Sequence, residues 1–321
     1  KKWIMTLATK DRISFYSAPD LKNWQLESEF GKNVGAHGGV WECPDLFPMQ
    51  YEGRTLWVLI VNLNPGAPNG GSGTQYFLGD FNGHVFTPMD TSIRWIDHGP
   101  DEYAGVTWHN TGGRTLFQGW MSNWDYANVI PTVSWRNAMT IPRQLQLKKA
   151  RGRFFIASQP VDEISNRVRT HIERNNIEMN PGQEIVPFSD ALPSPSLIRL
   201  KLDKKASFSI SLVGSGGDSL IIGYDRATEN YYIDRRKSGI VSFHHRFAAK
   251  NVAPRISETE AVELSIVLDV NAVEFFADEG LTTMTSLFFP VKELSALHVN
   301  AGEQLRIVHL SIDALKPMNG R

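Results

Sequence analysis

The sequence predicts an all-β protein in which part of a β-propeller is followed by an antiparallel β-sandwich. Three observations support this fold class. No stretch of helical period stands out, a strand-rich unit recurs in the first half, and short alternating segments separated by Gly, Asp and Asn turns fill the second half. The expected domains are residues 1–162, the C-terminal part of the propeller; 163–195, a linker and the start of the sandwich; and 196–321, the sandwich.

The repeat in the first half is carried by two apolar segments of similar sequence. Arg54–Asn62 reads Arg-Thr-Leu-Trp-Val-Leu-Ile-Val-Asn, and it returns at Arg114–Asn123 as Arg-Thr-Leu-Phe-Gln-Gly-Trp-Met-Ser-Asn. Residues 1–7 are a weaker relative, and aromatic segments with Asp-containing turns follow at 15–24 and 76–86. A strand-rich unit that recurs after about 60 residues is typical of a propeller blade, although common blades are somewhat shorter.

The number of blades in the first half is too small for a closed propeller. Propellers close with about four to eight blades, whereas residues 1 to about 160 supply fewer than three. An unclosed propeller would leave strand edges unpaired. We therefore expect roughly half of the propeller to lie upstream of Lys1.

The second half begins with a polar, charged stretch at about 158–195 that ends in Pro-Ser-Pro. Beyond it, alternation predicts strands at 207–213, 219–225, 231–236, 263–269, 272–277, 284–289 and 305–312. Asp269 and Glu274 flank a Val-Asn-Ala corner, and we expect them to stabilise a turn there.

The composition narrows the classes of ligand. The formal net charge is −1 and the Lys and Arg residues are spread along the chain, which argues against a nucleic-acid partner. No apolar run approaches the roughly 20 residues of a membrane span. No metal-site spacing and no phosphate-binding Gly-rich loop occur, so no metal and no cofactor are expected. Nine Trp, eight Tyr and seventeen Phe residues could supply stacking platforms for neutral sugars.

Residues 35–47 carry the strongest functional signal. Glu42 stands in the sequence between the indole of Trp41 and the thiol of Cys43, and apolar neighbours favour the protonated carboxyl that a general acid needs. A lone Glu in a turn is more often solvated, so this assignment depends on the surrounding motif. Cys43 is the chain's single cysteine and has no basic partner at a suitable spacing. We expect it to pack beside the acid and not to act as a nucleophile.

The Trp-Glu-Cys-Pro-Asp run at 41–45, placed at the end of a blade strand, resembles glycoside hydrolase family 32, which includes levanases, exo-inulinases and invertases. Segments that look like the same family follow in order at 70–77, 119–128, 131–143, 223–226 and 273–277. The resemblance implies a five-bladed propeller, with about the last three blades in this chain, and then a sandwich. It also implies that the protein is secreted, periplasmic or on the cell surface.

The resemblance implies that β-fructosides are hydrolysed with retention of the anomeric configuration, by two carboxylates about 5–5.5 Å apart. Glu42 matches the acid/base. The family's nucleophile lies in a Trp-Met-Asn-Asp-Pro-Asn-Gly type motif and its transition-state stabiliser in an Arg-Asp-Pro motif, and neither motif occurs in the 321 residues. Both precede the Glu-Cys segment in the family, so we expect them in the missing N-terminal segment of the propeller.

Further residues are assigned to the substrate by the same resemblance. Trp135 matches a tryptophan that lines the fructose pocket, Trp124 lies in the same loop, and Gln75 falls in the similar segment at 70–77. Either indole could instead belong to a core.

The segment that contains Asp101 and Tyr103 is usually written Asp-Phe-Tyr-Ala in the family. Here Glu102 replaces the Phe, which puts an extra carboxylate near the rim of the site. Asp45 is expected to anchor the Glu42 turn through backbone amides, with a contact to a sugar hydroxyl as the alternative.

The function predicted is a retaining glycoside hydrolase that releases fructose from β-fructans, levan or inulin, or from sucrose. Two alternatives remain open: a fructosyltransferase of the same family, and a catalytically inactive fructan-binding protein, because this chain holds one of the three carboxylates. The preference for β-2,6 or β-2,1 linkages does not follow from the sequence.

Overall fold

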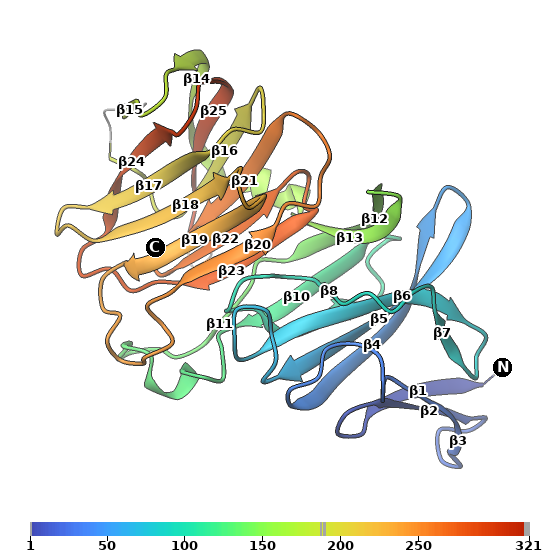
Figure 1. Cartoon of the computed structure of the whole chain (residues 1–321). Helices are drawn as coiled ribbons and strands as arrows, with labels where there is room; N and C mark the ends of the chain where they lie inside the picture. The colour runs from blue at the N-terminus through green and yellow to red at the C-terminus, as the bar shows by residue number, and fades with distance from the viewer. Residues whose placement is uncertain (1, 187, 189–190, 318–321) are drawn as a thin grey trace. The chain divides into compact units, whose positions relative to one another are not determined.

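The computed structural model describes residues 2–186, 188 and 191–317. In these ranges the chain forms twenty-five strands, β1–β25, and two short 3-10 helices, η1 (Ala127–Val129) and η2 (Asp162–Arg167) (Figure 1). The all-β fold class is therefore confirmed. The chain divides into two compact units, residues 1–125 with 137–157, and residues 126–136 with 158–321.

The first unit contains three antiparallel sheets that follow one another along the chain. The first sheet consists of β1 (Trp3–Ala8), β2 (Ile13–Ala18) and β3 (Gln25–Phe30). The second consists of β4 (Val40–Tyr51), β5 (Arg54–Asn64), β6 (Gly73–Phe81), β7 (Phe86–Pro88) and β8 (Arg94–Trp95). The third consists of β9 (Tyr103–Trp108), β10 (Thr115–Met121), β11 (Ala138–Met139), β12 (Arg143–Ala150) and β13 (Arg153–Pro160).

The sequence repeat corresponds to equivalent strands of two sheets. β5 and β10 are each the second strand of their sheet in chain order, and both are central, with strands paired on either side. Residues 58–63 of β5 are all buried, which explains why Leu56–Val61 is a continuous apolar run and not an alternating one. The strands predicted at both copies of the repeat are confirmed.

The second unit contains two antiparallel six-stranded sheets, in the orders β14-β25-β16-β21-β22-β23 and β15-β24-β17-β18-β19-β20. Their bounds are β14 (Val168–Met179), β15 (Glu184–Ile185), β16 (Ser196–Leu202), β17 (Phe208–Gly214), β18 (Ser219–Asp225), β19 (Asn230–Lys237), β20 (Lys250–Pro254), β21 (Val262–Leu268), β22 (Ala272–Ala277), β23 (Thr282–Leu287), β24 (Leu294–Ala301) and β25 (Leu305–Leu315).

A single apolar core joins the two sheets of this unit. Alternate residues such as Ile198 and Leu200 of one sheet and Ile210 and Leu212 of the other are fully or almost fully buried in the same cluster. Inward-facing alternate residues from two sheets are what a sandwich requires. The predicted sandwich is confirmed.

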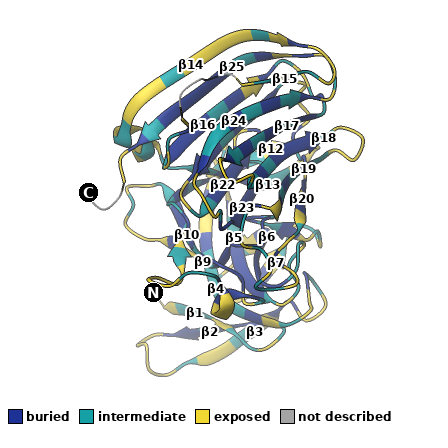
Figure 2. Ribbon diagram, turned by 90° about the vertical axis from the view of Figure 1, so that its left-hand side faces the viewer, coloured by how far each residue is buried: buried dark blue, intermediate teal, exposed yellow. Residues whose placement is uncertain are grey.

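Several elements of the sandwich differ from the prediction. β14 lies in the range expected to hold the linker and the start of the sandwich. It pairs with β25, and most of its twelve residues are exposed (Figure 2). β15, β16, β20 and β24 were also not predicted, and β23 ends at Leu287, before the expected end at residue 289. Glu274 does not flank a corner, because it lies inside β22 and is 2% exposed. Asp269 has the expected turn role, since its Oδ1 accepts a hydrogen bond from the Val270 amide.

Candidate active site around Glu42

Glu42 lies at the start of β4, and not at the end of a strand as expected. The pairing of β4 with β5 shifts register between Glu42 and Asp45, so Cys43 and Pro44 form a bulge. Cys43 has a φ of 43°, in the left-handed region that an L-residue adopts at some cost. Bulges of this kind re-aim side chains beside functional sites.

The expected apolar surroundings of Glu42 are not built from Trp41. Successive side chains of a strand point to opposite faces, so Trp41 enters the core while Glu42 faces the other way. The indole is 1% exposed, its Nε1 donates to the Ala36 carbonyl oxygen at 3.0 Å, and its ring stacks on His37. The second expected neighbour, Cys43, is exposed. Partial burial and the nearby Glu42 carboxylate raise the pKa of the Cys43 thiol, which keeps it in the less nucleophilic protonated form.

Tyr103 is the side chain that the structure brings to Glu42. It is the first residue of β9, in the next sheet of the same unit, and its hydroxyl donates a short hydrogen bond to Glu42 Oε2. Burial first, and then the bond to Glu42, raise the pKa of Tyr103, so the phenol keeps its proton and stays a donor. Across the part of the chain that the structure describes, no protein group hydrogen-bonds to Oε1 of Glu42. One carboxyl oxygen is fixed and the other is available to a substrate.

Asp45 links the bulge to the same neighbouring strand. Its Oδ2 accepts hydrogen bonds from the Thr107 amide at 2.7 Å and from Thr107 Oγ1 at 2.6 Å. The expected bond to a backbone amide is present, but the amide belongs to β9 and not to the turn around Glu42. Asp45 therefore holds β4 against the strand that supplies Tyr103.

Asn62 is a residue of this site that the sequence analysis missed. It is 0% exposed, and its Nδ2 donates to the carbonyl oxygens of Cys43 at 3.1 Å and Gly105 at 3.3 Å. Its Oδ1 accepts from the Gly105 amide at 3.1 Å and from Thr74 Oγ1 at 2.6 Å. One buried amide thus connects the bulge of β4 to β6 and β9. The available signal was a lone polar residue at the end of a buried apolar run, Leu59–Val61.

An aromatic row extends from Tyr103. Its ring lies edge-on to Trp120, with centroids 6.4 Å apart, and Trp120 lies 5.0 Å from Trp124. Trp124 is 48% exposed, so it is not a core indole. Its position is fixed by a hydrogen bond from its amide to Ser72 Oγ at 3.0 Å.

Asp101 and Glu102 are both buried, at 0% and 1% exposure. Glu102 therefore does not add a carboxylate to an open rim, which corrects the expectation. Its Oε1 would lie 2.2 Å from a Cβ added to Gly119, so the carboxylate packs directly against that glycine of β10. The long side chain fits at a position where the family has Phe because no Cβ opposes it.

The remaining expected substrate residues lie in different surroundings. Gln75 is 0% exposed, and both ends of its amide bond to the backbone of Ala36, at 2.8 and 3.3 Å. In this arrangement Gln75 supports the loop that leads into β4. Trp135 is 41% exposed and belongs to the 126–136 segment of the second unit.

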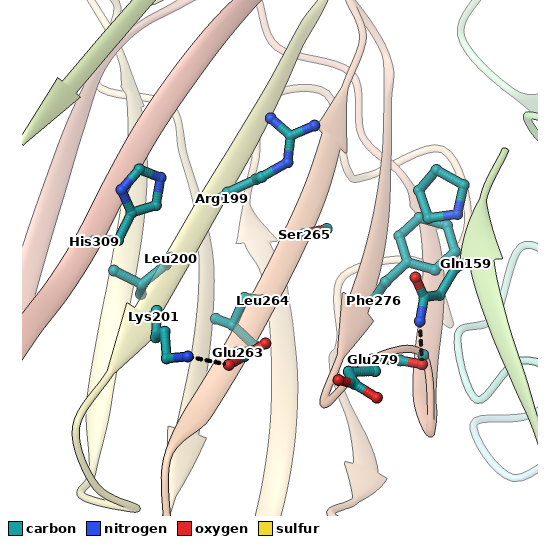
Figure 3. Close-up of a pocket in the computed structure, with 12 residues that line it drawn as sticks. Gln159, Arg199, Leu200, Lys201, Glu263, Leu264, Ser265, Phe276, Glu279 and His309 are labelled. Atoms are coloured by element: carbon teal, nitrogen blue, oxygen red, sulfur yellow. Dashed lines mark hydrogen bonds and ion pairs between the residues drawn. The ribbon is translucent and has the colours of Figure 1, made fainter. Parts of the chain in front are cut away.

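A cavity of about 290 Å³ lies on the sandwich, lined by residues of β16 and β21 and by the β22–β23 turn (Figure 3). Lys201 Nζ pairs with Glu263 Oε1 at 2.6 Å, and Gln159 Nε2 donates to the Glu279 carbonyl oxygen at 2.6 Å. None of the expected site residues lines this cavity.

Two features are absent from the described ranges. Within residues 2–186, 188 and 191–317, no three His, Cys, Asp or Glu side chains are grouped so that they could hold a metal ion. Over the same ranges, no helix has both the length and the apolar character to cross a membrane.

Comparisons with known proteins match the chain from end to end. The family model described as Glycosyl hydrolases family 32 N-terminal domain matches residues 1–158, and the one described as Glycosyl hydrolases family 32 C terminal matches residues 165–314. The N-terminal domain model matches nearly all of the region 1–162 that was expected to be the C-terminal part of a propeller. The match does not show that a segment lies upstream, so that segment stays a prediction.

Individual relatives agree with the family models. The chain is 36% identical over 333 residues to a levanase of Bacillus subtilis (strain 168). The aligned region covers 100% of this chain and 49% of the levanase. It is 37% identical over 308 residues to the extracellular exo-inulinase of Aspergillus ficuum. That aligned region covers 90% of this chain and 57% of the exo-inulinase. The crystal structure of exo-inulinase from Aspergillus awamori matches with a TM-score of 0.87 at 30% identity, over 98% of this chain and 65% of that one. The chain spans about half the length of the curated relatives it matches.

Proposed function

The chain belongs to glycosyl hydrolase family 32, and from this we propose that it takes part in retaining hydrolysis of β-fructans, levan or inulin, or of sucrose, with Glu42 as the acid/base. The observation that carries the assignment is the hydrogen bond from the Tyr103 hydroxyl to Glu42 Oε2. It fixes the carboxyl group in one orientation and leaves Oε1 for the reacting oxygen. The levanase and exo-inulinase relatives support the substrate class.

In the proposed reaction Glu42 acts twice. A carboxylate nucleophile attacks the anomeric carbon of the fructosyl unit while Glu42, protonated on Oε1, gives its proton to the departing glycosidic oxygen. The C–O bond breaks and a covalent fructosyl-enzyme forms. Glu42, now a carboxylate, takes a proton from water as that water attacks the same carbon, and fructose leaves with the nucleophile restored.

We propose that the nucleophile and the transition-state stabiliser come from a part of the protein outside these 321 residues. The support is that neither an Asn-Asp-Pro nor an Arg-Asp-Pro run occurs in the sequence. The exo-inulinase of Aspergillus ficuum is named extracellular, which supports action outside the cell.

The test is Glu42→Gln in the protein that carries this chain. We expect fructose release from levan, inulin or sucrose to fall by about 10²–10⁴-fold, the usual contribution of a positioned acid/base. A fructoside with a good leaving group needs no protonation, so formation of the covalent intermediate from that substrate should be much less affected.

The matched control is Glu263→Gln, on the sandwich, where the carboxylate is exposed and paired with Lys201. It should leave turnover unchanged. Wild-type turnover in the Glu42→Gln protein would end the proposal.

A further inference from the structure

Asn123 is a buried polar side chain that the proposed reaction does not use. It is 1% exposed and lies in the first unit, as do all four of its partners. Its Nδ2 donates to the carbonyl oxygens of Gly70 at 3.2 Å and Pro100 at 2.7 Å. Its Oδ1 accepts from the amides of Ser72 at 3.4 Å and Asp125 at 2.9 Å. Both donors and both acceptor positions of the side-chain amide are therefore engaged.

Two of these partners belong to the loop between β5 and β6, residues 65–72, which we call the glycine loop. The loop closes on itself, because the Gly71 carbonyl oxygen accepts from the amides of Gly66 at 2.9 Å and Ala67 at 3.2 Å. Gly71 has a φ of 65°, and a Cβ on it would lie 2.0 Å from Asn123 Oδ1. Only glycine fits against this amide, so the shape of the loop is adapted to Asn123.

The end of β5 and the glycine loop support the chain that leads into β4. A Cβ on Gly39 would lie 2.1 Å from the Asn64 carbonyl oxygen, and a Cβ on Gly38 would lie 3.1 Å from Gly66 Cα. The two backbones therefore pack on each other with no side chain between them. Glu42 follows Gly39 by three residues, so this contact sets the direction in which β4 carries Glu42.

The second donor bond of Asn123 holds the chain that leads into β9. Pro100 stands three residues before Tyr103, and the two residues between them are buried. The Tyr103 hydroxyl in turn donates to Glu42 Oε2. One amide thus holds the segment before Glu42 and the segment before Tyr103, the two side chains that meet in this hydrogen bond.

We propose that Asn123 is a positioning residue that fixes the placement of Tyr103 relative to Glu42. This rests on the proposed function, in which Glu42 is the acid/base. A hydrogen bond weakens steeply when its distance or angle changes, so a small shift of either segment would loosen the carboxyl group. Asn123 is buried and acts on the reaction only through these two segments.

The first test is Asn123→Ala, which removes all four hydrogen bonds. We expect kcat/KM for fructose release to fall by about five- to ten-fold, because the bond between Tyr103 and Glu42 is misaligned but not removed. The loss should appear in kcat, with KM within about twofold.

A double variant separates this role from a purely structural one. In Tyr103→Phe protein the hydrogen bond that Asn123 aligns is already absent, so adding Asn123→Ala should lower kcat/KM by less than about twofold. A side chain that only stabilises the fold would cause the same loss in both backgrounds.

The second test is Gly38→Ala, which changes the other end of the same connection. Gly38 is exposed, and its new methyl group would press on Gly66 Cα and the Pro65 carbonyl oxygen, both 3.1 Å away. We expect kcat/KM to fall by about two- to five-fold with Tm close to that of wild type. This variant decides the question if Asn123→Ala does not fold.

Each test has a matched control on the sandwich. Asn271 Nδ2 donates to the Phe288 carbonyl oxygen at 3.3 Å, and Asn271→Ala should lower Tm but leave kcat/KM unchanged. Gly216 is an exposed glycine, and the nearest atom to a Cβ added there would be 3.9 Å away. Gly216→Ala should leave both Tm and kcat/KM unchanged.

Three results would overturn the inference. The first is an Asn123→Ala protein with the kcat/KM of the Asn271→Ala control, and the second is an equal loss from Asn123→Ala in wild-type and Tyr103→Phe protein. The third is a Gly38→Ala protein with wild-type kcat/KM. Failure of the proposed function is distinct, because it would appear as fructose release that does not depend on Glu42.

Discussion

Replacing Tyr103 with Phe tests whether Glu42, the proposed acid/base, is oriented by its neighbour in the next sheet. The ring is 2% exposed and lies edge-on to Trp120, and Phe preserves both the volume and this ring contact. The substitution therefore removes one thing, the hydroxyl that donates to Glu42 Oε2. The variant should fold, and its defect should be confined to the carboxyl group.

The size of the effect follows from the charge on the acceptor. A hydrogen bond to an ionised group contributes about 1.5–3 kcal/mol, and about 1.4 kcal/mol corresponds to a factor of ten in rate. If most of this energy serves to orient Glu42 in the transition state, kcat/KM should fall by about 10- to 100-fold. Burial and the bond to Glu42 raise the pKa of Tyr103, so the wild-type donor is present at every pH used for the assay. The defect should persist from mildly acidic to neutral pH.

The assay is initial-rate fructose release, measured in wild type, Tyr103→Phe, Glu42→Gln and the double variant. If Tyr103 acts through Glu42, adding Tyr103→Phe to Glu42→Gln should lower kcat/KM hardly further, because the effects of two groups that act as a unit are not additive. Tyr76→Phe is the control, since that buried hydroxyl accepts a hydrogen bond from the Ile156 amide. A Tyr103→Phe protein with the kcat/KM of the Tyr76→Phe control would refute the reasoning, as would fully additive losses in the double variant.

Two further predictions concern stability. Asn62→Leu should lower the free energy of unfolding by about 3 kcal/mol or more in urea, because Thr74 Oγ1 and the Gly105 amide lose a buried acceptor; a loss under 1 kcal/mol would contradict it. Burial lowers the pKa of His98 from 6.5 to about 4, so the unfolded chain binds this proton at higher pH than the folded one. The stability that neutral His98 contributes is complete above pH 6.5 and lost as pH falls toward 4, by at most about 3 kcal/mol. His98→Gln should therefore lose less Tm than wild type between pH 7 and pH 4.

Strands with regular alternation could be predicted from the sequence, and exposed edge strands could not. β18 and β22 were predicted with their observed bounds, because each is a short, mostly buried run bordered by turn residues. β14 was placed in a range read as linker because its two isoleucines that pack on the core, Ile172 and Ile177, stand among polar, mostly exposed residues. Charged residues are common on an edge strand, since they discourage pairing with other chains. Its partner β25 is more than 120 residues away, beyond any local pattern.

In the candidate site, too, local motifs could be predicted from the sequence and contacts between distant residues could not. Glu42 and Tyr103 were both assigned, on motifs local to each, but nothing in either motif shows that they meet. Their contact depends on how the second and third sheets of the first unit pack, which is a property of residues 61 positions apart. Asn62 was missed for the same reason, because its hydrogen-bond partners lie on three other strands, β4, β6 and β9.

Glu42, the proposed acid/base, is therefore oriented by the packing of two sheets more than by its own strand. Three polar connections run from β4 and β5 to β9: Tyr103 to Glu42, Thr107 to Asp45, and Asn62 to Gly105. All three contacts on β9 fall within five consecutive residues, so a small shift of this strand would move them together. The bulge at Cys43 and Pro44 interrupts the regular pairing of β4 with β5 directly after Glu42. The second sheet therefore holds this part of β4 weakly. A carboxyl group held mainly from the neighbouring sheet keeps a fixed direction only while the two sheets stay packed, and changes in β9 should impair catalysis before they unfold the protein.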